Sequence, residues 1–221
     1  MATVKVIGSP TSAEVARVLT CLFEKDIEFQ LIRVDNYKGQ RRLPDYLKLQ
    51  PFGQALAFED GKQILVDSRE ICRHVAEKYA QQGNKDLLGS GTLQRASIEQ
   101  WLLTEARNFD PPASDLVYNL AFAPLLALEQ DREAVERGKK KLNTVLDIYD
   151  RRLDETQYLA GDKFTLADLS HLPNAHRLVQ YTDFSAMFES RKRVARWWEA
   201  ISSRASWKRV VQMQQEPPHI I

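Results

Sequence analysis

The first part of the chain alternates between strand-like and helical stretches. Residues 4–7 alternate in polarity and are rich in β-branched side chains, which is typical of a strand. After a Gly-Ser-Pro turn, apolar residues recur at helical spacing, at Val15, Val18, Leu19 and Leu22. Residues 28–34 alternate again, so two strands with a helix between them predict a parallel βαβ crossover.

The pattern then breaks before it returns as a hairpin and a helix. Residues 36–53 are polar and interrupted by glycine and proline, which predicts a long connection with one short helix. Asp60 and Gly61 lie between two β-rich stretches and predict a tight hairpin. A helix is predicted to begin at Ser68. The order β-α-β followed by β-β-α predicts a small α/β domain over residues 1–82.

Beyond a predicted linker at residues 83–91, every periodic stretch is helical. Thr165 and Asp168 form the pattern of a capping box, which predicts a helix start. Residues 183–190 are expected to be irregular. The sequence thus predicts an all-α domain over residues 92–221. Its predicted helices cover residues 92–108, 114–128, 131–155, 166–179 and 190–213.

Charge and composition narrow the class of protein. The 31 basic and 30 acidic side chains leave a net charge of +1, so neither nucleic acid nor an anionic membrane is an expected partner. No apolar run approaches the roughly 18 residues of a membrane span, and the first residues lack a secretory signal pattern. The histidines are scattered, so no metal site is expected. Two cysteines outside any CxxC pattern fit a cytoplasmic protein.

Five ordered stretches carry a family resemblance. They are GSPTSAEVARVL (8–19), PFGQALAFEDG (51–61), VDSREICRHVAEKYA (66–80), LAGDKFTLADLSHLP (159–173) and RVARWWEAISSRASW (193–207). Together they resemble the glutathione transferases, and the PFGQ, acid–serine and YLAGDKFTLADLSH segments resemble the phi class of plants. The resemblance implies a cytosolic transferase fold, with a thioredoxin-like α/β domain for glutathione and an all-α domain for a hydrophobic second substrate. It also implies a homodimer with Phe52 as the aromatic key to the partner subunit, and glutathione as co-substrate without a cofactor.

Ser12 is the candidate catalytic residue. Conjugation needs the thiolate of glutathione, because a thiol is a poor nucleophile. Lowering a thiol pKa by two units takes about 2.7 kcal/mol, and a hydroxyl hydrogen bond to a charged acceptor supplies roughly 1.5–3 kcal/mol. The resemblance assigns this role to Ser12, while its position at a predicted helix start also fits an ordinary N-cap.

Glutathione is expected to lie along residues that match the family's binding motifs. The resemblance implies that Asp67 faces the γ-glutamyl ammonium and that the hydroxyl and amide of Ser68 take the γ-glutamyl carboxylate. Asp67 is one methylene shorter than the Glu usual in the family, and a plain helix cap is the alternative for this pair. Arg41 and Arg42 are candidates for the glycyl carboxylate, with a solvated pair as the alternative. Gln54 matches the family's glutamine beside the tripeptide backbone.

The chain departs from the family at Leu56, where the family has a cis proline. In the family the residue before this proline, here Ala55, pairs its backbone with the cysteinyl part of glutathione. A cis bond costs about 0.5–1 kcal/mol before proline but about 2.5–4 kcal/mol before other residues. The turn is therefore expected to be either trans and reshaped or strained, and both options weaken glutathione binding.

A hydrophobic pocket for the second substrate is expected around residues that follow the nucleophile or lie on the helix expected to face it. For Leu116, Leu120 and Phe122, which belong to the predicted helical domain, packing in the core is an equal alternative. The stretch 108–112 is expected to end a helix and open this pocket. The candidate residues are Ala13, Asn36, Leu116, Leu120 and Phe122.

The expected activity is conjugation of glutathione to hydrophobic electrophiles, or reduction of an organic hydroperoxide. The alternative is a carrier of flavonoids or other apolar metabolites with little turnover, which Leu56 and Asp67 favour. A thiol transferase is not expected, because Ser12 and not a cysteine lies at the start of the first helix. A scaffold module of a larger assembly is a third alternative, against which the lack of an extra domain in the sequence argues.

Overall fold

The computed structural model describes residues 4–34 and 39–215 and divides the chain into two compact units. The N-terminal unit takes its described residues from Met1–Leu87 and Ala205–Ile221, and the helical unit is Leu88–Arg204. The sequence pattern predicts the last helix as part of the second domain, whereas the structure groups it with the first unit. No helix of the described residues is long and apolar enough to cross a membrane.

The N-terminal unit contains the predicted βαβ and ββα motifs around one four-stranded sheet. The strand order is β2-β1-β3-β4, with β1 parallel to β2 and the other pairs antiparallel. The parallel crossover and the Asp60-Gly61 hairpin are therefore confirmed. Its elements are β1 (Val4–Gly8), α1 (Ala13–Glu24), β2 (Phe29–Ile32), the 3₁₀ turn η1 (Gln40–Arg42), α2 (Pro44–Leu49), β3 (Leu56–Asp60), β4 (Gln63–Leu65), α3 (Ser68–Lys78) and α12 (Ala205–Gln215).

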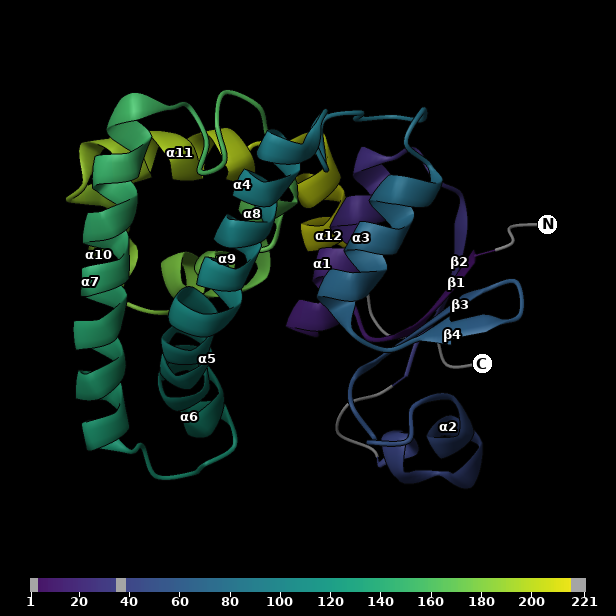
Figure 1. The fold of residues 1–221 in the computed structure, drawn as a ribbon. Helices are drawn as coiled ribbons and strands as arrows, with labels where there is room; N and C mark the ends of the chain where they lie inside the picture. The colour runs from purple at the N-terminus through teal and green to yellow at the C-terminus, as the bar shows by residue number, and fades with distance from the viewer. Residues whose placement is uncertain (1–3, 35–38, 216–221) are drawn as a thin grey trace. The chain divides into compact units, whose positions relative to one another are not determined.

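Side chains along β1 and β3 point alternately to the two faces of the sheet, and different helices pack on each face. Val6 pairs with Phe58 on one face, and the Phe58 ring lies 6.3 Å from the ring of His74 on α3. Ile7 pairs with Ala57 on the other face, where both belong to an apolar cluster with Tyr46 of α2. Figure 1 shows α1 and α3 together on one side of the sheet and α2 on the other. This arrangement confirms the thioredoxin-like α/β unit.

Helix α12 packs against α1 and closes the N-terminal unit. The carboxylate of Glu24, the last residue of α1, accepts hydrogen bonds from the hydroxyl of Ser206 and from Asn84 Nδ2, the latter at 2.9 Å. The guanidinium of Arg209 lies 4.0 Å from the centre of the Phe23 ring, a cation–π contact. These contacts explain why the last helix belongs with residues that lie almost two hundred positions earlier.

The helical unit is built from helices joined by short turns. The single predicted helix over residues 166–179 is two helices, and α10 lies inside the stretch 183–190 that was expected to be irregular. The predicted helix 190–213 is interrupted after Ser202. The elements are α4 (Thr92–Thr104), η2 (Glu105–Phe109), α5 (Asp110–Val117), η3 (Tyr118–Phe122), α6 (Ala123–Leu125), α7 (Arg132–Glu155), α8 (Leu166–Leu169), α9 (Leu172–Tyr181), α10 (Ser185–Glu189) and α11 (Lys192–Ser202).

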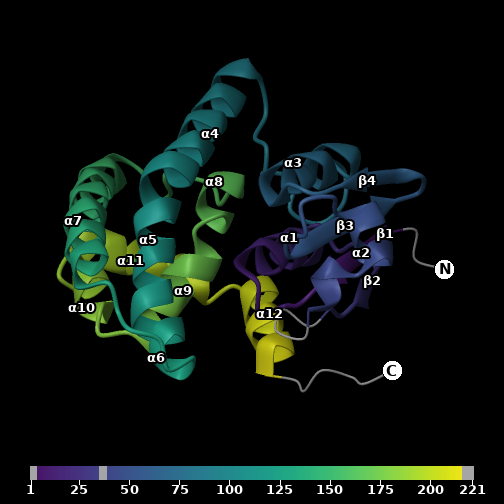
Figure 2. The same ribbon diagram turned by 90° about the horizontal axis from the view of Figure 1, so that it is seen from below.

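The expected break at residues 108–112 is not a break. The π-helical segments η2 and η3 connect α4, α5 and α6 into one continuous helical path, which Figure 2 shows as a line of segments with α7 beside α5. Pro111 and Pro112 are the second and third residues of α5, which begins directly after η2. Proline lacks the amide hydrogen that an α-helix interior needs, and a wider turn before it changes the hydrogen-bond spacing without ending the helix. The prediction that a helix ends in this stretch was wrong.

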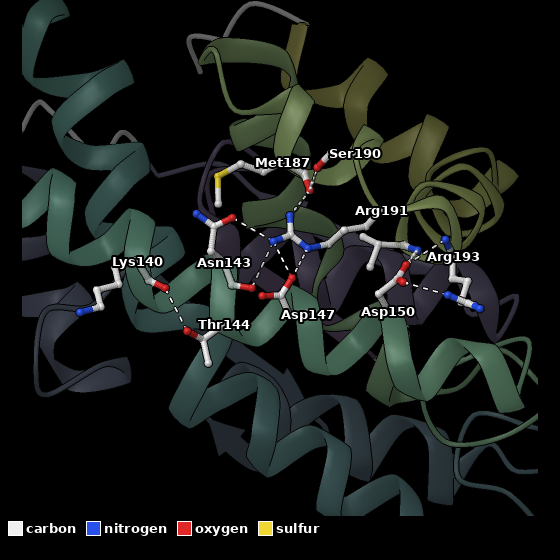
Figure 3. Close-up of polar contacts among 10 residues, drawn as sticks. Lys140, Asn143, Thr144, Asp147, Asp150, Met187, Ser190, Arg191 and Arg193 are labelled. Carbon is white, nitrogen blue, oxygen red and sulfur yellow. Dashed lines mark hydrogen bonds and ion pairs between the residues drawn. The ribbon is translucent and has the colours of Figure 1, made fainter.

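Two buried or half-buried carboxylates fix helix starts in the helical unit. Asp168 completes the predicted capping box with Thr165 and also accepts from Trp197 Nε1 at 2.9 Å. Asp150 of α7 accepts the amides of Arg193 and Val194, at 3.0 and 3.2 Å, so it caps α11 from a different helix. Figure 3 shows this cap beside the ion pair of Arg191 with Asp147. The local capping box could be found in the sequence, whereas the cap from α7 depends on the tertiary fold.

Candidate active site

The pairing of β1 with β3 brings two loops of the predicted site together. Gly8 at the end of β1 pairs with Leu56 at the start of β3, so the loop after β1 lies next to the segment that leads into β3. Gly8 has a φ of 151°, and a Cβ at this position would collide with the carbonyl oxygen of Ala55. Only glycine therefore allows the two backbones to approach this closely.

Ser12 lies at the junction of this loop with α1. Its backbone amide donates to the carbonyl of Ser9 at 2.8 Å, and its own carbonyl accepts the amide of Ala16 at 2.9 Å. These bonds fix Ser12 as the N-cap residue, with φ −79° and ψ 137°, yet its side chain makes no capping hydrogen bond. The half-buried hydroxyl is thus not used as the cap that its position alone predicts. It remains at the positive end of a helix of 12 residues.

The turn before β3 is held by its own side chains. The amide of Phe52 donates to Gln50 Oε1 at 2.9 Å, and the hydroxyl of Tyr46 donates to the carbonyl of Gln54 at 2.6 Å. Gln50 Nε2 also donates to Gln54 Oε1 at 3.1 Å, which leaves the amide group of Gln54 as its donor toward a ligand. Phe52 is 81% exposed at this turn.

The peptide bond between Ala55 and Leu56 is trans, because the described residues contain no cis peptide bond. Of the two options that the sequence left open, the structure therefore has the trans turn. Leu56 is fully buried as the first residue of β3, and Ala55 is half-buried with its carbonyl turned toward Gly8. The side chain of Leu56 belongs to the core, so the substitution of the family's proline is absorbed by packing.

Asp67 and Ser68 stand at the start of α3. Asp67 Oδ1 accepts the amides of Arg69 and Glu70 at 2.9 and 3.0 Å, so the carboxylate does act as a helix cap. Ser68 is only 3% exposed, and its hydroxyl oxygen accepts a hydrogen bond from Nη1 of Arg17 at 2.7 Å. Arg17 is not among the residues predicted for the site, because a lone arginine within a helical pattern gives no sign of a partner 51 positions away.

The two candidate arginines for the glycyl carboxylate lie in η1. Arg41 is half-buried and Arg42 is exposed. A Cβ at Gly53 would lie 3.5 Å from the carbonyl oxygen of Arg41, so η1 is a neighbour of the turn that carries Gln54. The candidate residue Asn36 lies outside the described residues.

The remaining candidates for the second-substrate pocket lie in two different units. Ala13 is half-buried at the start of α1, whereas Leu116, Leu120 and Phe122 belong to the helical unit. Leu116 is fully buried, and a Cβ at Gly138 of α7 would lie 3.1 Å from it, which is the core packing that the sequence left open. Leu120 and Phe122 are half-buried in the π-helical segment η3.

The described residues include neither a reactive cysteine nor a cluster of side chains that could bind a metal ion. Cys21 and Cys72 are both buried between α1 and α3, and a hydrogen bond with Cys72 together with burial raises the pKa of the Cys21 thiol. A raised pKa keeps the thiol protonated and unreactive. Among the described residues no group of three or more His, Cys, Asp or Glu side chains is placed to hold a metal ion.

Comparison with known proteins places both units in one family. Residues 2–77 match the glutathione S-transferase N-terminal domain, and residues 109–205 match the glutathione S-transferase C-terminal domain. Glutathione S-transferase F10 of Arabidopsis thaliana is 42% identical over 207 residues, which cover 94% of this chain and 96% of that protein.

Solved structures show the same relationship. The crystal structure of glutathione transferase F2 from Populus trichocarpa has 52% sequence identity and a TM-score of 0.94, and the match covers 96% of this chain and 99% of that one. Maize glutathione S-transferase I in complex with an atrazine glutathione conjugate has 28% identity and a TM-score of 0.89, over 99% and 100% of the two chains. The chain therefore belongs to the glutathione S-transferase family, and within it to the phi class of plants.

Proposed function

We propose that this protein is a glutathione transferase in which the Ser12 hydroxyl stabilises the thiolate of glutathione. The observation that carries the proposal is the state of that hydroxyl, which lies at the start of α1 without a capping bond. A hydroxyl that donates to a thiolate supplies roughly 1.5–3 kcal/mol, and the helix dipole adds about 0.3–1 kcal/mol. Together they match the about 2.7 kcal/mol that lowers a thiol pKa by two units.

The cysteinyl part of glutathione is expected between the loop of Ser12 and the turn of Ala55. The close pairing of Gly8 with Leu56 puts these two segments side by side, which supports this placement. The amide NH2 of Gln54 lies on the same turn and provides a donor to the tripeptide backbone. Because the peptide bond before Leu56 is trans, the backbone of Ala55 offers a different geometry from that of the family's cis proline turn.

The two charged ends of glutathione have separate sets of partners. At the γ-glutamyl end, Ser68 begins α3 and offers its amide and hydroxyl to the carboxylate. Asp67 uses Oδ1 for its two capping bonds, so Oδ2 is available to the γ-glutamyl ammonium. At the glycyl end, Arg41 and Arg42 supply positive charge beside the turn of Gln54.

The second substrate is a hydrophobic electrophile or an organic hydroperoxide. The maize relative that is solved with an atrazine glutathione conjugate holds the product of such a conjugation. In the helical unit we assign Leu120 and Phe122 to the second substrate, because both side chains are half-buried and therefore partly open to a ligand. Phe122 also lies 5.4 Å below the guanidinium of Arg177, which fixes its ring. Leu116 is fully buried and belongs to the core instead.

The active protein is proposed to be a cytoplasmic homodimer. Phe52 exposes 81% of its surface although it is a large apolar side chain, and its turn is held firmly by Gln50. A large, exposed aromatic side chain on a hydrogen-bonded turn fits an anchor that inserts into a pocket of a partner subunit. The names of the relatives are those of transferases, which favours the enzyme over the carrier of apolar metabolites.

The test compares Ser12→Ala with Ser9→Ala. Ser9 lies in the same loop, and its hydroxyl is already paired with that of Thr11 at 2.7 Å, so this variant is the matched control. Conjugation of 1-chloro-2,4-dinitrobenzene and glutathione affinity by calorimetry are measured separately. We expect Ser12→Ala to lower kcat/KM by about 10- to 150-fold, with a raised thiol pKa in the complex and little change in Ser9→Ala.

The outcome separates the enzyme from the carrier. Turnover that is equal in wild type and Ser12→Ala refutes the role of Ser12. Glutathione binding without turnover in the wild type instead supports the carrier.

A further inference from the structure

Arg17 is a buried charged side chain on the helix that begins at Ser12. It is the fifth residue of α1 and only 1% exposed. Arginine is almost never fully buried unless it is paired. One of its partners is the hydroxyl oxygen of Ser68, at 2.7 Å, in the first turn of α3.

The chemistry of this hydrogen bond fixes its direction. A guanidinium has five N–H donors and no acceptor, so Ser68 Oγ must be the acceptor. Ser68 keeps its own hydroxyl proton, and that proton cannot be given to Arg17. The side chain of Ser68 is therefore held as a donor to a further group, next to its own backbone amide at the helix start.

The neighbouring donors of α3 are already committed. The amides of Arg69 and Glu70 donate to Asp67 Oδ1, which leaves the amide and the hydroxyl of Ser68 as the pair offered to a ligand. Two donors on one residue match the two oxygens of a carboxylate. The charge of Arg17 behind the hydroxyl strengthens it as a donor, because hydrogen bonds in a chain polarise one another.

We propose that Arg17 is a positioning residue for the γ-glutamyl carboxylate of glutathione, because it holds the Ser68 hydroxyl as a donor to that group. The proposal rests on the proposed function, since it names a residue that acts through Ser68 in the glutathione site. Arg17 does not touch glutathione itself. It joins α1, which carries the thiolate-stabilising serine, to α3, which carries the carboxylate-binding serine.

The test measures binding of two tripeptides to Arg17→Gln. One is glutathione, and the other is its analogue with a 4-aminobutyryl group in place of the γ-glutamyl group, which lacks the carboxylate. We expect Arg17→Gln to raise the Kd for glutathione roughly tenfold and to leave the Kd for the analogue within about twofold, while kcat at saturating glutathione stays close to that of the wild type. Arg33→Gln is the control, because Arg33 donates to the backbone carbonyl of Met213 in the same unit, away from Ser68.

Arg17→Lys is the milder variant in case glutamine prevents folding. Lysine keeps the charge and a donor but not the planar fork, so we expect a Kd for glutathione between those of the wild type and Arg17→Gln, again with no change for the analogue. Equal weakening of both tripeptides by either variant overturns the proposal, since it shows a structural role only. The binding measurement does not depend on Ser12, so its failure is distinct from a failure of the catalytic proposal.

Discussion

The capping of α11 by Asp150 gives a stability prediction whose size follows from the hydrogen bonds. Asp150 Oδ1 accepts the amides of Arg193 and Val194, and Oδ2 accepts Arg193 Nη1 at 3.2 Å. Arg191 is the N-cap residue by position, but its side chain makes no cap bond, so Asp150 has no substitute there. Loss of a helix cap costs about 1 kcal/mol, and a partly exposed ion pair adds about 0.2–1 kcal/mol. We therefore expect Asp150→Ala to lower the free energy of unfolding by roughly 1.2–2 kcal/mol.

The assay is urea unfolding at fixed protein concentration, with the midpoint compared at a constant m-value. Asp154→Ala is the matched control, because the more exposed Asp154 binds only the side chain of Arg193, at 2.7 Å. Its expected cost is below about 1 kcal/mol. If Asp150→Ala costs no more than Asp154→Ala, the capping argument is refuted.

The same cap predicts a dependence on pH. Burial raises the pKa of Asp150, but the hydrogen bonds from Val194 and Arg193 outweigh it and hold the pKa below its ordinary value. The stabilisation is therefore present above the unfolded pKa of about 3.9 and is lost as the pH falls through the folded value. The difference between wild type and Asp150→Ala is expected to shrink in that acid range.

Three further predictions concern single side chains. Burial, with the charge of Arg177, lowers the pKa of His176 from 6.5 to about 4. The free energy of unfolding is therefore expected to fall by up to about 3 kcal/mol as the pH falls from 6.5 to 4. Urea midpoints of His176→Gln are expected to lack this dependence on pH, and a dependence equal to that of the wild type counts against the burial argument. Cys21 and Cys72 are buried with a raised pKa at Cys21, so a disulfide reagent is expected to label them only on unfolding, and rapid labelling of the native protein would contradict this. Leu56→Pro changes the first residue of β3, a position where proline is tolerated. The variant is expected to raise glutathione affinity in calorimetry by up to roughly tenfold, because proline lowers the cost of the family's cis turn. An unchanged Kd means that the trans turn already serves binding.

The elements that the sequence predicted correctly depend on neighbours along the chain. The hairpin at Asp60 and Gly61, the crossover between the first two strands and the capping box of Thr165 with Asp168 are all local patterns, and each is present. Their hydrogen bonds join residues only a few positions apart, or strands joined by one helix. Local chemistry is therefore enough to define them.

The features that were missed depend on contacts between distant segments. The continuous helical path through Pro111 and Pro112 needs a π-helical segment, which has no sequence period of its own. Arg17 and Ser68 are 51 positions apart, so their hydrogen bond becomes visible only when α1 and α3 pack together. At Ser12, the sequence predicted the helix start correctly but could not tell whether the hydroxyl would serve as its cap.

The path of the chain through its two units bears on how the protein is made. The polypeptide leaves the N-terminal unit at Leu87 and returns to it only at Ala205, so helix α12 emerges from the ribosome after the whole helical unit. At ordinary rates of synthesis this delay is on the order of ten seconds. During that time the buried carboxylate of Glu24 lacks its partner Ser206, and the apolar side of α1 is open to chaperones. A truncation that removes α12 is therefore expected to destabilise the N-terminal unit, although the deleted residues follow the whole helical unit in the sequence.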